Sequence, residues 1–273
     1  MSSLVQRLLT AVILIPLVVW VVLYAPESVF LWVLSGIVFI AAMEWAALTG
    51  VACRGGKIIF ALPLLVLCHA LLMVNATVVS NLMLLSLVFW LFVIIFVLSM
   101  PAYLMAMRHD KKIMAGLGYV LLSLTFVSLY QLRHVFEHGP DLMMYLLLLI
   151  WIADSGAYFA GRTLGQHKLS AIISPGKSIE GVIGGLLTCL LFAIAATGYF
   201  SIEYPAAFIL LSLSVVVVSV FGDLFESLLK RRAKVKDSGN ILPGHGGVLD
   251  RIDSLIAAAP VFFAGLLLTG MFA

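Results

Sequence analysis

The sequence predicts an all-α integral membrane protein, a polytopic bundle of about nine transmembrane helices. Hydrophobic residues make up 63% of the 273 residues and charged residues 11%, whereas a soluble domain carries roughly a quarter charged residues. Apolar stretches recur along the chain at about the 20 residues that a helix needs to cross a bilayer. The positions of the Lys and Arg residues alternate with these stretches, as expected of a chain that crosses the membrane repeatedly.

The expected helices span residues 8–24, 29–48, 58–76, 81–100, 113–132, 142–160, 181–200, 205–229 and 254–272. The first resembles a secretion signal, but its length and the Pro26–Glu27 pair after it favour a retained helix. The whole chain, 1–273, is expected to form a single transmembrane domain. Within it, residues 1–140 supply lipid-facing and supporting helices, and residues 141–273 carry the chemically active groups.

The charges predict the orientation. Of the 16 Lys and Arg residues, 15 fall at the N-terminus or in even-numbered connections, and Arg133 is the exception. Because cations concentrate on the cytoplasmic side, the N-terminus is predicted to be cytoplasmic and the C-terminus periplasmic. The basic face then lies against anionic lipid headgroups. We expect membrane lipid as its partner and no nucleic acid.

Polar residues gather in FGDLFESLLKRRAKVKDSGNILPGHGGVLDRIDS, residues 221–254. Asp223, Glu226, Ser227, Lys230 and Arg231 follow spacings of three and four, which places them on one face of a helix. Asp223 lies roughly 10 Å deeper in the membrane than Lys230, at the rise of an α-helix. A carboxylate at that depth is costly unless it is paired or metal-bound. Asp223 is therefore a candidate functional residue.

Asp250 and Asp253 begin the last helix three residues apart, again on one face. Acids at this position can cap a helix, and that role is expected for Asp253 or Ser254. Asp250 is instead expected to face Asp223. Two carboxylates at headgroup depth form a hard oxygen site suited to Mg²⁺, so Asp223 and Asp250 are the predicted metal ligands.

Groups that bind anions surround these acids. The cations are Lys230, Arg231, Lys236 and Arg251, and the glycines are Gly244, Gly246 and Gly247. Glycine lets backbone N–H groups approach phosphate oxygens closely. His245 lies among the glycines, either as a phosphate donor or as an exposed loop histidine.

A second polar cluster is ADSGAYFAGRTLGQHKLSAIISPGKSIEG, residues 153–181. Its GKS triplet is not a P-loop, because position 171 is Ala where that motif requires Gly. Ser174, Lys177, Ser178 and Glu180 lead into the next helix, and the Lys177–Ser178 pair and the turn after Gly176 are expected to contact phosphate. Asp154 is expected to pair structurally rather than to act in catalysis. Glu44, at the end of the helix 29–48, is expected to reach water.

The residues after 226 have a recognisable spacing. They fit S-x-x-K-R-x(4)-K-D-x-G-x(3)-P-x-H-G-G-x-x-D-R-x-D at thirteen typed positions over 27 residues. This pattern resembles the signature of phosphatidate cytidylyltransferases, in the bacterial CDP-diglyceride synthase form. The similarity extends to ADSGAY, to the glycines and arginine of 161–165 and to SPGKSIEG at 174–181. Ile179 departs from the aromatic residue expected there.

The resemblance implies the reaction CTP + phosphatidic acid → CDP-diacylglycerol + pyrophosphate, with Mg²⁺ as cofactor, and a homodimer in the bacterial inner membrane with its site facing the cytoplasm. Whether a second, monovalent cation binds is left open. The implied catalytic residues are Asp223, Asp250, Lys230 and His245. The implied substrate-binding residues are Ser227, Arg231, Lys236, Asp237, Gly246, Gly247, Arg251, Asp253, Ser174, Lys177 and Glu180.

The alternative from another class is an ion or solute transporter with a relay of Asp154, Asp223 and Asp250. The charges crowd one side of the membrane, and no pair of broken helices in matching halves indicates an inverted repeat. A CDP-alcohol phosphotransferase is disfavoured because its D-G-x-x-A-R motif is missing.

Overall fold

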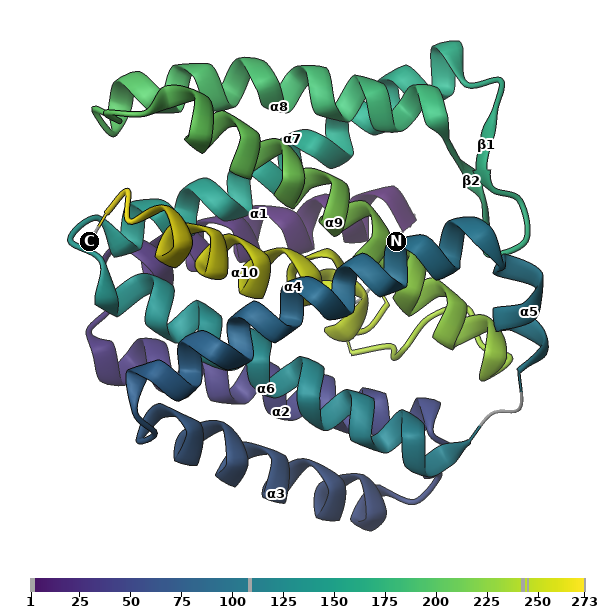
Figure 1. The fold of residues 1–273 in the computed structure, drawn as a ribbon. Helices are drawn as coiled ribbons and strands as arrows, with labels where there is room; N and C mark the ends of the chain where they lie inside the picture. Colours follow the sequence, from purple (N-terminus) through teal and green to yellow (C-terminus); the bar gives the residue numbers. More distant parts are fainter. Residues whose placement is uncertain (1–2, 108–109, 242–243, 245, 273) are drawn as a thin grey trace.

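The computed structural model describes residues 3–107, 110–241, 244 and 246–272, with the backbone alone for residues 3–9. The helices are α1 (Ser3–Leu23), α2 (Glu27–Leu48), α3 (Arg54–Leu72), α4 (Ala76–Ser99), α5 (Pro101–Ala106), α6 (Lys111–Val135), α7 (Gly139–Leu164), α8 (Ile179–Tyr199), α9 (Pro205–Arg232) and α10 (Leu249–Thr269). The long helices run roughly antiparallel to one another in one bundle (Figure 1).

Eight of the described helices, α2, α3, α4, α6, α7, α8, α9 and α10, are long and apolar enough to cross a membrane. They correspond to the last eight of the nine expected crossings. The first expected crossing coincides with α1, whose described side chains, Thr10–Leu23, form a shorter apolar helix. The multi-pass helical architecture predicted from composition is thus confirmed.

One short hairpin interrupts the helical architecture. Strands β1 (Lys168–Ser170) and β2 (Ser174–Ser178) pair antiparallel between α7 and α8, with Lys168 opposite Ser178 and Ser170 opposite Ser174. Neither this hairpin nor α5 was expected from the sequence. Two strands of three and five residues are too short to produce a clear alternation of polar and apolar residues.

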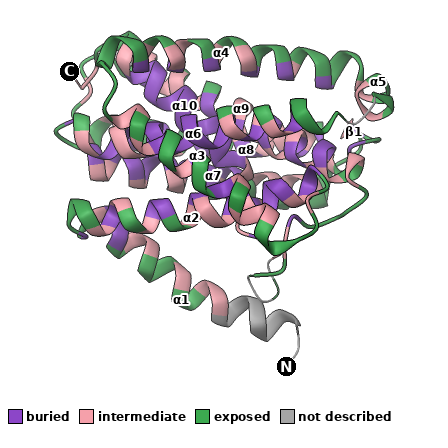
Figure 2. Ribbon diagram, turned by 90° about the horizontal axis from the view of Figure 1, so that it is seen from below, coloured by how far each residue is buried: buried purple, intermediate pink, exposed green. Residues whose placement is uncertain are grey.

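Helix α10 forms the centre of the bundle. It contacts α2, α4, α6, α7 and α9, and its residues from Ser254 to Leu266 are all buried. In Figure 2 the buried residues concentrate on the central helices, whereas the outward faces of α1 and α4 are exposed. Any residue at the start of α10 is therefore held by contacts from both halves of the chain.

Helices α7 and α8 pack unusually closely. A side-chain carbon added at Gly185 would lie 2.8 Å from the carbonyl oxygen of Ala153, and one added at Gly181 would lie 2.9 Å from that of Ala157. Small residues let two membrane helices approach backbone to backbone. This contact fixes the hairpin, which joins the two helices, at one end of the bundle (Figure 1).

Three short segments that connect the long helices meet at this same end. The hairpin, α5 and the connection from α9 to α10 all lie there (Figure 1). The Arg232 guanidinium donates from Nη2 to the Met107 carbonyl oxygen at 3.3 Å, which joins the end of α9 to the segment after α5. The gathering of charge at one end, expected from the sequence, is thus present in the fold.

Candidate active site

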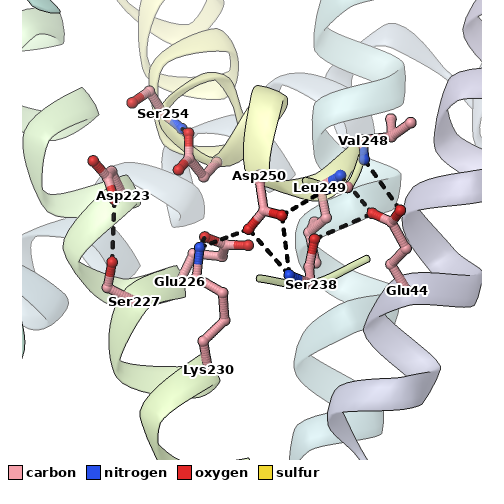
Figure 3. A network of polar contacts seen from close by, with 12 residues as sticks. Glu44, Asp223, Glu226, Ser227, Lys230, Ser238, Val248, Leu249, Asp250 and Ser254 are labelled. Atoms are coloured by element: carbon pink, nitrogen blue, oxygen red, sulfur yellow. Dashed lines mark hydrogen bonds and ion pairs between the residues drawn. The ribbon is translucent and has the colours of Figure 1, made fainter. Parts of the chain in front are cut away.

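The last turns of α9 carry the predicted polar face. Asp223, Glu226, Ser227 and Lys230 lie on it, and the Ser227 hydroxyl donates to Asp223 Oδ1 at 3.2 Å. Figure 3 shows Glu226 and Lys230 beside Asp250 at the start of α10, while Asp223 and Ser227 contact each other higher on α9. The spacing of three and four residues correctly predicted that they share one side of the helix.

Lys230 lies between two buried carboxylates. Its ammonium donates to Asp250 Oδ1 at 2.7 Å and forms an ion pair with Glu226 one turn earlier. The side chains of Lys230, Glu226 and Asp250 are 11%, 3% and 7% exposed. One cation thus neutralises part of the charge of two acids where little water reaches any of them.

Asp250 also organises the loop before α10. It accepts hydrogen bonds from the backbone nitrogen of Ser238, at 3.0 Å and 3.2 Å to its two oxygens, and from that of Gly247 at 2.8 Å (Figure 3). Ser238 lies near the start of the loop and Gly247 near its end. The carboxylate therefore closes the loop on itself and ties it to α9 through Lys230.

Glu44, from α2, holds the same loop from the opposite side. Its carboxylate accepts from the backbone nitrogens of Leu249 at 2.7 Å and Val248 at 3.1 Å, and from the Ser238 hydroxyl at 3.2 Å (Figure 3). The residue is 5% exposed. The expectation that Glu44 reaches water was wrong, because free backbone N–H groups at the start of α10 need an acceptor.

The predicted cap of the last helix was also wrong. Helix α10 begins at Leu249, so Asp253 and Ser254 lie in its second turn rather than at its cap. Asp253 accepts from the backbone nitrogen of Ser254 at 2.6 Å. Glu44 instead supplies acceptors for the N-terminal N–H groups, and a residue so distant in sequence gives no local capping signal.

Two glycines of the loop are explained by these carboxylates. Gly246 has φ +81, and a side-chain carbon there would approach Asp250 Oδ2 to 2.7 Å. Gly247 has no room for a side-chain carbon because the Glu44 carboxylate and the Ser238 hydroxyl occupy the space. Both glycines therefore have a structural role in the loop, in addition to their predicted approach to phosphate oxygens. They allow the loop to wrap around Glu44 and Asp250.

The hairpin reaches the site through Lys177. Its ammonium forms an ion pair with Asp223 Oδ2 at 2.7 Å and donates to the Val220 carbonyl oxygen at 3.2 Å. Lys177 also lines a cavity of about 300 Å³ whose walls include Asp154 and Arg162. The two polar clusters of the sequence thus meet at the contact between Lys177 and Asp223.

The remaining residues of the second cluster shape the hairpin. Glu180 accepts from the His167 ring at 2.6 Å and from the His167 backbone nitrogen at 3.2 Å, which closes the base of the hairpin. Ser174 pairs with Ser170 across its strands. In the structure Glu180 and Ser174 therefore contact the hairpin itself.

Other predicted binding residues lie around the loop. Arg231, Lys236, Asp237 and Arg251 are exposed, which leaves their polar groups accessible to a ligand. His245 lies outside the described residues, so its predicted role remains a prediction. Asp154 faces the cavity, and its carboxylate interacts electrostatically with Asp223, Lys177 and Arg251.

Negative charge exceeds positive charge at the centre of the site. The Glu226 carboxylate interacts through space with those of Asp223, Asp250 and Asp253, whereas the ion pairs at this centre are made by Lys177 and Lys230. The Glu226 carboxylate is buried, and Lys230 is the cation paired with it. Such an excess of buried carboxylate charge fits a bound divalent cation.

The donor set fits Mg²⁺ if a substrate completes it. Among the residues that the structure describes, no three acidic, histidine or cysteine side chains are close enough to enclose a metal ion by themselves. Mg²⁺ commonly binds one or two carboxylates and takes its other ligands from water and substrate phosphates. The predicted ligands Asp223 and Asp250 are paired with different lysines, Lys177 and Lys230.

Glu44 is the site residue that the sequence reasoning missed. The signal available was a glutamate near the C-terminal end of an otherwise apolar helix, in a chain with only 13 acidic residues. Intramembrane acids are functional candidates by default. Its partner, the start of α10, could not be read from the sequence because the two are joined only by the tertiary packing of α2 against α10.

Comparison with known proteins agrees with this arrangement. A model of the cytidylyltransferase family matches residues 5–269. The phosphatidate cytidylyltransferase of Pseudomonas aeruginosa is 37% identical over 267 residues, which cover 97% of both chains. That of Haemophilus influenzae is 52% identical over 130 residues, 46% of this chain and 45% of its own. That of Bacillus subtilis is 41% identical over 150 residues, 54% of this chain and 55% of its own.

The family model and the match to the Pseudomonas aeruginosa protein span nearly the whole chain, and they include α2 with Glu44 as well as the α9 to α10 region with the acidic site. The chain therefore belongs to the cytidylyltransferase family, among the bacterial phosphatidate cytidylyltransferases.

Proposed function

We propose that this protein transfers the cytidylyl group of CTP to phosphatidate, giving CDP-diacylglycerol and pyrophosphate for phospholipid synthesis. The observation that carries the proposal is the group of buried carboxylates and paired lysines at one end of an apolar bundle, in a chain 37% identical over its length to a phosphatidate cytidylyltransferase. A lipid phosphate and a nucleotide can meet there at headgroup depth.

The chemistry requires little from an acid or a base. A phosphate oxygen of phosphatidate attacks the α-phosphorus of CTP, a new P–O bond forms, and the bond from that phosphorus to the bridging oxygen of the β-phosphate breaks. Pyrophosphate leaves with the bonding electrons. The nucleophile is already an anion, so the main obstacle is bringing two polyanions together, and positioning and charge neutralisation lower the barrier.

The side chains divide this work. Lys230 neutralises Asp250 and Glu226 and holds the loop against α9. The exposed cations Arg231, Lys236 and Arg251 lie where they can contact the nucleotide phosphates. Asp223 and Asp250 would hold Mg²⁺, which neutralises phosphate charge when bound. We propose substrate contacts for the remaining predicted residues, Ser227, Asp237, Asp253, Gly246, Gly247, Ser174, Lys177 and Glu180, and catalytic donation for His245.

The proposal includes the arrangement in the membrane. With nine crossings, α1 being the first, a cytoplasmic N-terminus places the hairpin and the α9 to α10 loop on the cytoplasmic side of the bacterial inner membrane, where CTP is available. The charge distribution supports this orientation. The family resemblance further implies a homodimer, which the molecular mass of the detergent-solubilised protein would test.

The test is transfer of label from CTP into lipid. The purified protein in vesicles containing phosphatidate should form labelled CDP-diacylglycerol with Mg²⁺ and not with excess chelator. Asp223→Asn and Asp250→Asn should each lose at least about a hundredfold in kcat, whereas Glu203→Asn, at an exposed position far from the site, should not. Failure to transfer label to any phosphatidate tested would overturn the proposal, and ion flux through the same vesicles would support a transporter instead.

A further inference from the structure

The cavity beneath the hairpin extends the site toward α7. Its volume is about 300 Å³, and the residues that line it come from α7, β2, α8 and α9. Its apolar wall includes Val182 and Val220, and its polar wall consists of Asp154, Tyr158, Arg162, Lys177 and Ser178. A concave site that combines a few polar groups with an apolar wall is typical of a small-ligand pocket.

Arg162 is the cation in this cavity that is not held by an acid. Its Nη1 donates to the Tyr158 hydroxyl at 2.8 Å, and its guanidinium carbon lies 6.0 Å from the centre of the Tyr158 ring. Among the described residues, no ion pair joins Arg162 to a carboxylate, whereas Lys177 is paired with Asp223. A guanidinium has five N–H donors, so donors remain for an anion, and Tyr158 fixes the plane of the group.

The surroundings of the cavity indicate which anion reaches it. The exposed apolar side chains on α7 and at the start of α8 include Tyr158, Phe159, Ile179 and Ile183, which are 58%, 67%, 45% and 51% exposed. In a membrane protein such faces lie against lipid. The exposed cations Lys236 and Arg251 belong instead to the loop and to α10. The hairpin cavity is therefore the part of the site with lipid-facing helices as its walls.

The cavity also adjoins the acidic centre. Lys177 lines it and contacts Asp223, a predicted Mg²⁺ ligand, at 2.7 Å. An anion bound by Arg162 would thus lie beside the carboxylates where the proposed transfer occurs.

We propose that this cavity binds the phosphate of the membrane lipid substrate, with Arg162 as its main ligand and Tyr158 as the positioning residue of the guanidinium. A planar guanidinium binds two phosphate oxygens side by side, which an ammonium does not do. The inference rests on the proposed function for the identity of the lipid, and it places the lipid phosphate in the cavity beside Asp223.

The kinetic test measures each substrate separately. Initial rates are recorded in mixed micelles, first while the surface fraction of phosphatidate is varied at saturating CTP. The CTP concentration is then varied at a saturating surface fraction of phosphatidate. Arg162→Gln should raise the apparent KM for phosphatidate by roughly tenfold to a hundredfold and leave that for CTP within about twofold. Smaller increases in the KM for phosphatidate are expected for Arg162→Lys, which keeps the charge but not the planar guanidinium, and for Tyr158→Phe. Arg54→Gln, an exposed cation at the start of α3, is the matched control and should change neither constant.

A binding test without CTP separates this inference from the proposed function. The wild-type protein in nanodiscs should retain phosphatidate over phosphatidylcholine in native mass spectrometry, and Arg162→Gln should lose that preference. A protein that retains phosphatidate but transfers no label would contradict the proposed function and support the lipid site. An increase confined to the KM for CTP would assign Arg162 to the nucleotide and overturn the inference. Unchanged KM values for both substrates would also overturn it. If Arg162→Gln aggregates on size-exclusion chromatography, the same kinetic and binding measurements on Arg162→Lys decide the question.

Discussion

The Glu44 carboxylate accepts a hydrogen bond from the backbone nitrogen of Leu249 at 2.7 Å, although 205 positions separate the two residues. This contact joins α2 to the first turn of α10. Asp250, the next residue, then faces Lys230 on α9. The first helices of the chain therefore hold the loop of the proposed active site in place, in addition to supporting the bundle.

We predict that Glu44→Gln lowers kcat strongly, because an amide nitrogen would face a backbone N–H donor in place of an oxygen. The buried mismatch should also cost about 1–3 kcal/mol of stability. Ser238→Ala removes only one of the three hydrogen bonds and should cost about 1 kcal/mol. Thermal unfolding in detergent and the transfer assay measure the two effects.

The matched control for Glu44 is Glu203→Gln, because Glu203 is exposed in the connection between α8 and α9. It should behave as wild type in both measurements. If Glu44→Gln retained full turnover and full stability, the hydrogen bonds from Val248 and Leu249 would not be needed to position the loop.

We predict that Lys230→Met is more damaging than Glu226→Gln. Removing the ammonium leaves Glu226 and Asp250 buried without their shared cation, and such a loss costs about 3–5 kcal/mol. Glu226→Gln removes one of several acids and leaves the contact between Lys230 and Asp250, so its cost should be smaller. Denaturation in detergent ranks the two variants.

The double variant Lys230→Met/Glu226→Leu separates stability from catalysis. It removes one cation and one acid together, so it should recover part of the lost stability. Turnover should stay low, because the contact between Lys230 and Asp250 is still missing. Recovery of turnover together with stability would show that Lys230 acts only by neutralising Glu226.

Much of the fold followed from the sequence because lipid imposes long apolar helices and satisfies no backbone groups. The face with Asp223, Ser227 and Lys230 followed from helical periodicity, and the family pattern located Asp250. These are properties of one segment, or of two segments joined by a short loop.

Contacts between distant segments were not predictable in the same way. The pairing of Lys177 with Asp223 depends on how closely the small residues of α7 and α8 bring the hairpin to α9. The same holds for the capping of α10 by Glu44. Periodicity orients a side chain on its own helix, but the partner is set by packing among helices.

We predict that Lys177→Met loosens the hairpin. Lys177 ties β2 to α9 through Asp223 and the Val220 carbonyl oxygen, so its loss should increase amide hydrogen exchange in residues 168–178. Asp223→Asn should increase exchange in the same segment, since it removes the charge that Lys177 binds. Exchange measured by mass spectrometry on both variants tests this.

Lys168→Met is the control for the hairpin, because Lys168 is an exposed residue of β1. Its loss should leave exchange across 168–178 near the wild-type level. Unchanged exchange in both Lys177→Met and Asp223→Asn would mean that the hairpin is held by its strands and by Glu180 alone.

We predict that Gly247→Ala abolishes turnover, although it adds a single methyl group. That carbon would overlap the Glu44 carboxylate and the Ser238 hydroxyl, both of which hold the loop. Gly55→Ala is the matched control, since an added carbon there meets no atom within 4 Å, and it should retain activity. Activity in Gly247→Ala equal to that of the control would show that the loop can shift without loss of function.

We predict that Arg133→Gln destabilises the protein without changing the KM for either substrate. Arg133 is 8% exposed, donates from Nε to the Val22 carbonyl oxygen at 2.8 Å and from Nη2 to that of Ala25, and lies over the Phe30 ring at 4.6 Å. It therefore binds the carbonyl groups at the end of α1 and in the turn to α2, at the opposite end of the bundle from the acidic site.

Losing charge-assisted bonds to buried carbonyl groups should cost about 2–4 kcal/mol. A lower melting temperature in detergent with unchanged KM values is expected, because the carbonyl groups lose their donor while the substrate contacts remain. A change in either KM at full stability would instead place Arg133 in communication with the substrate site.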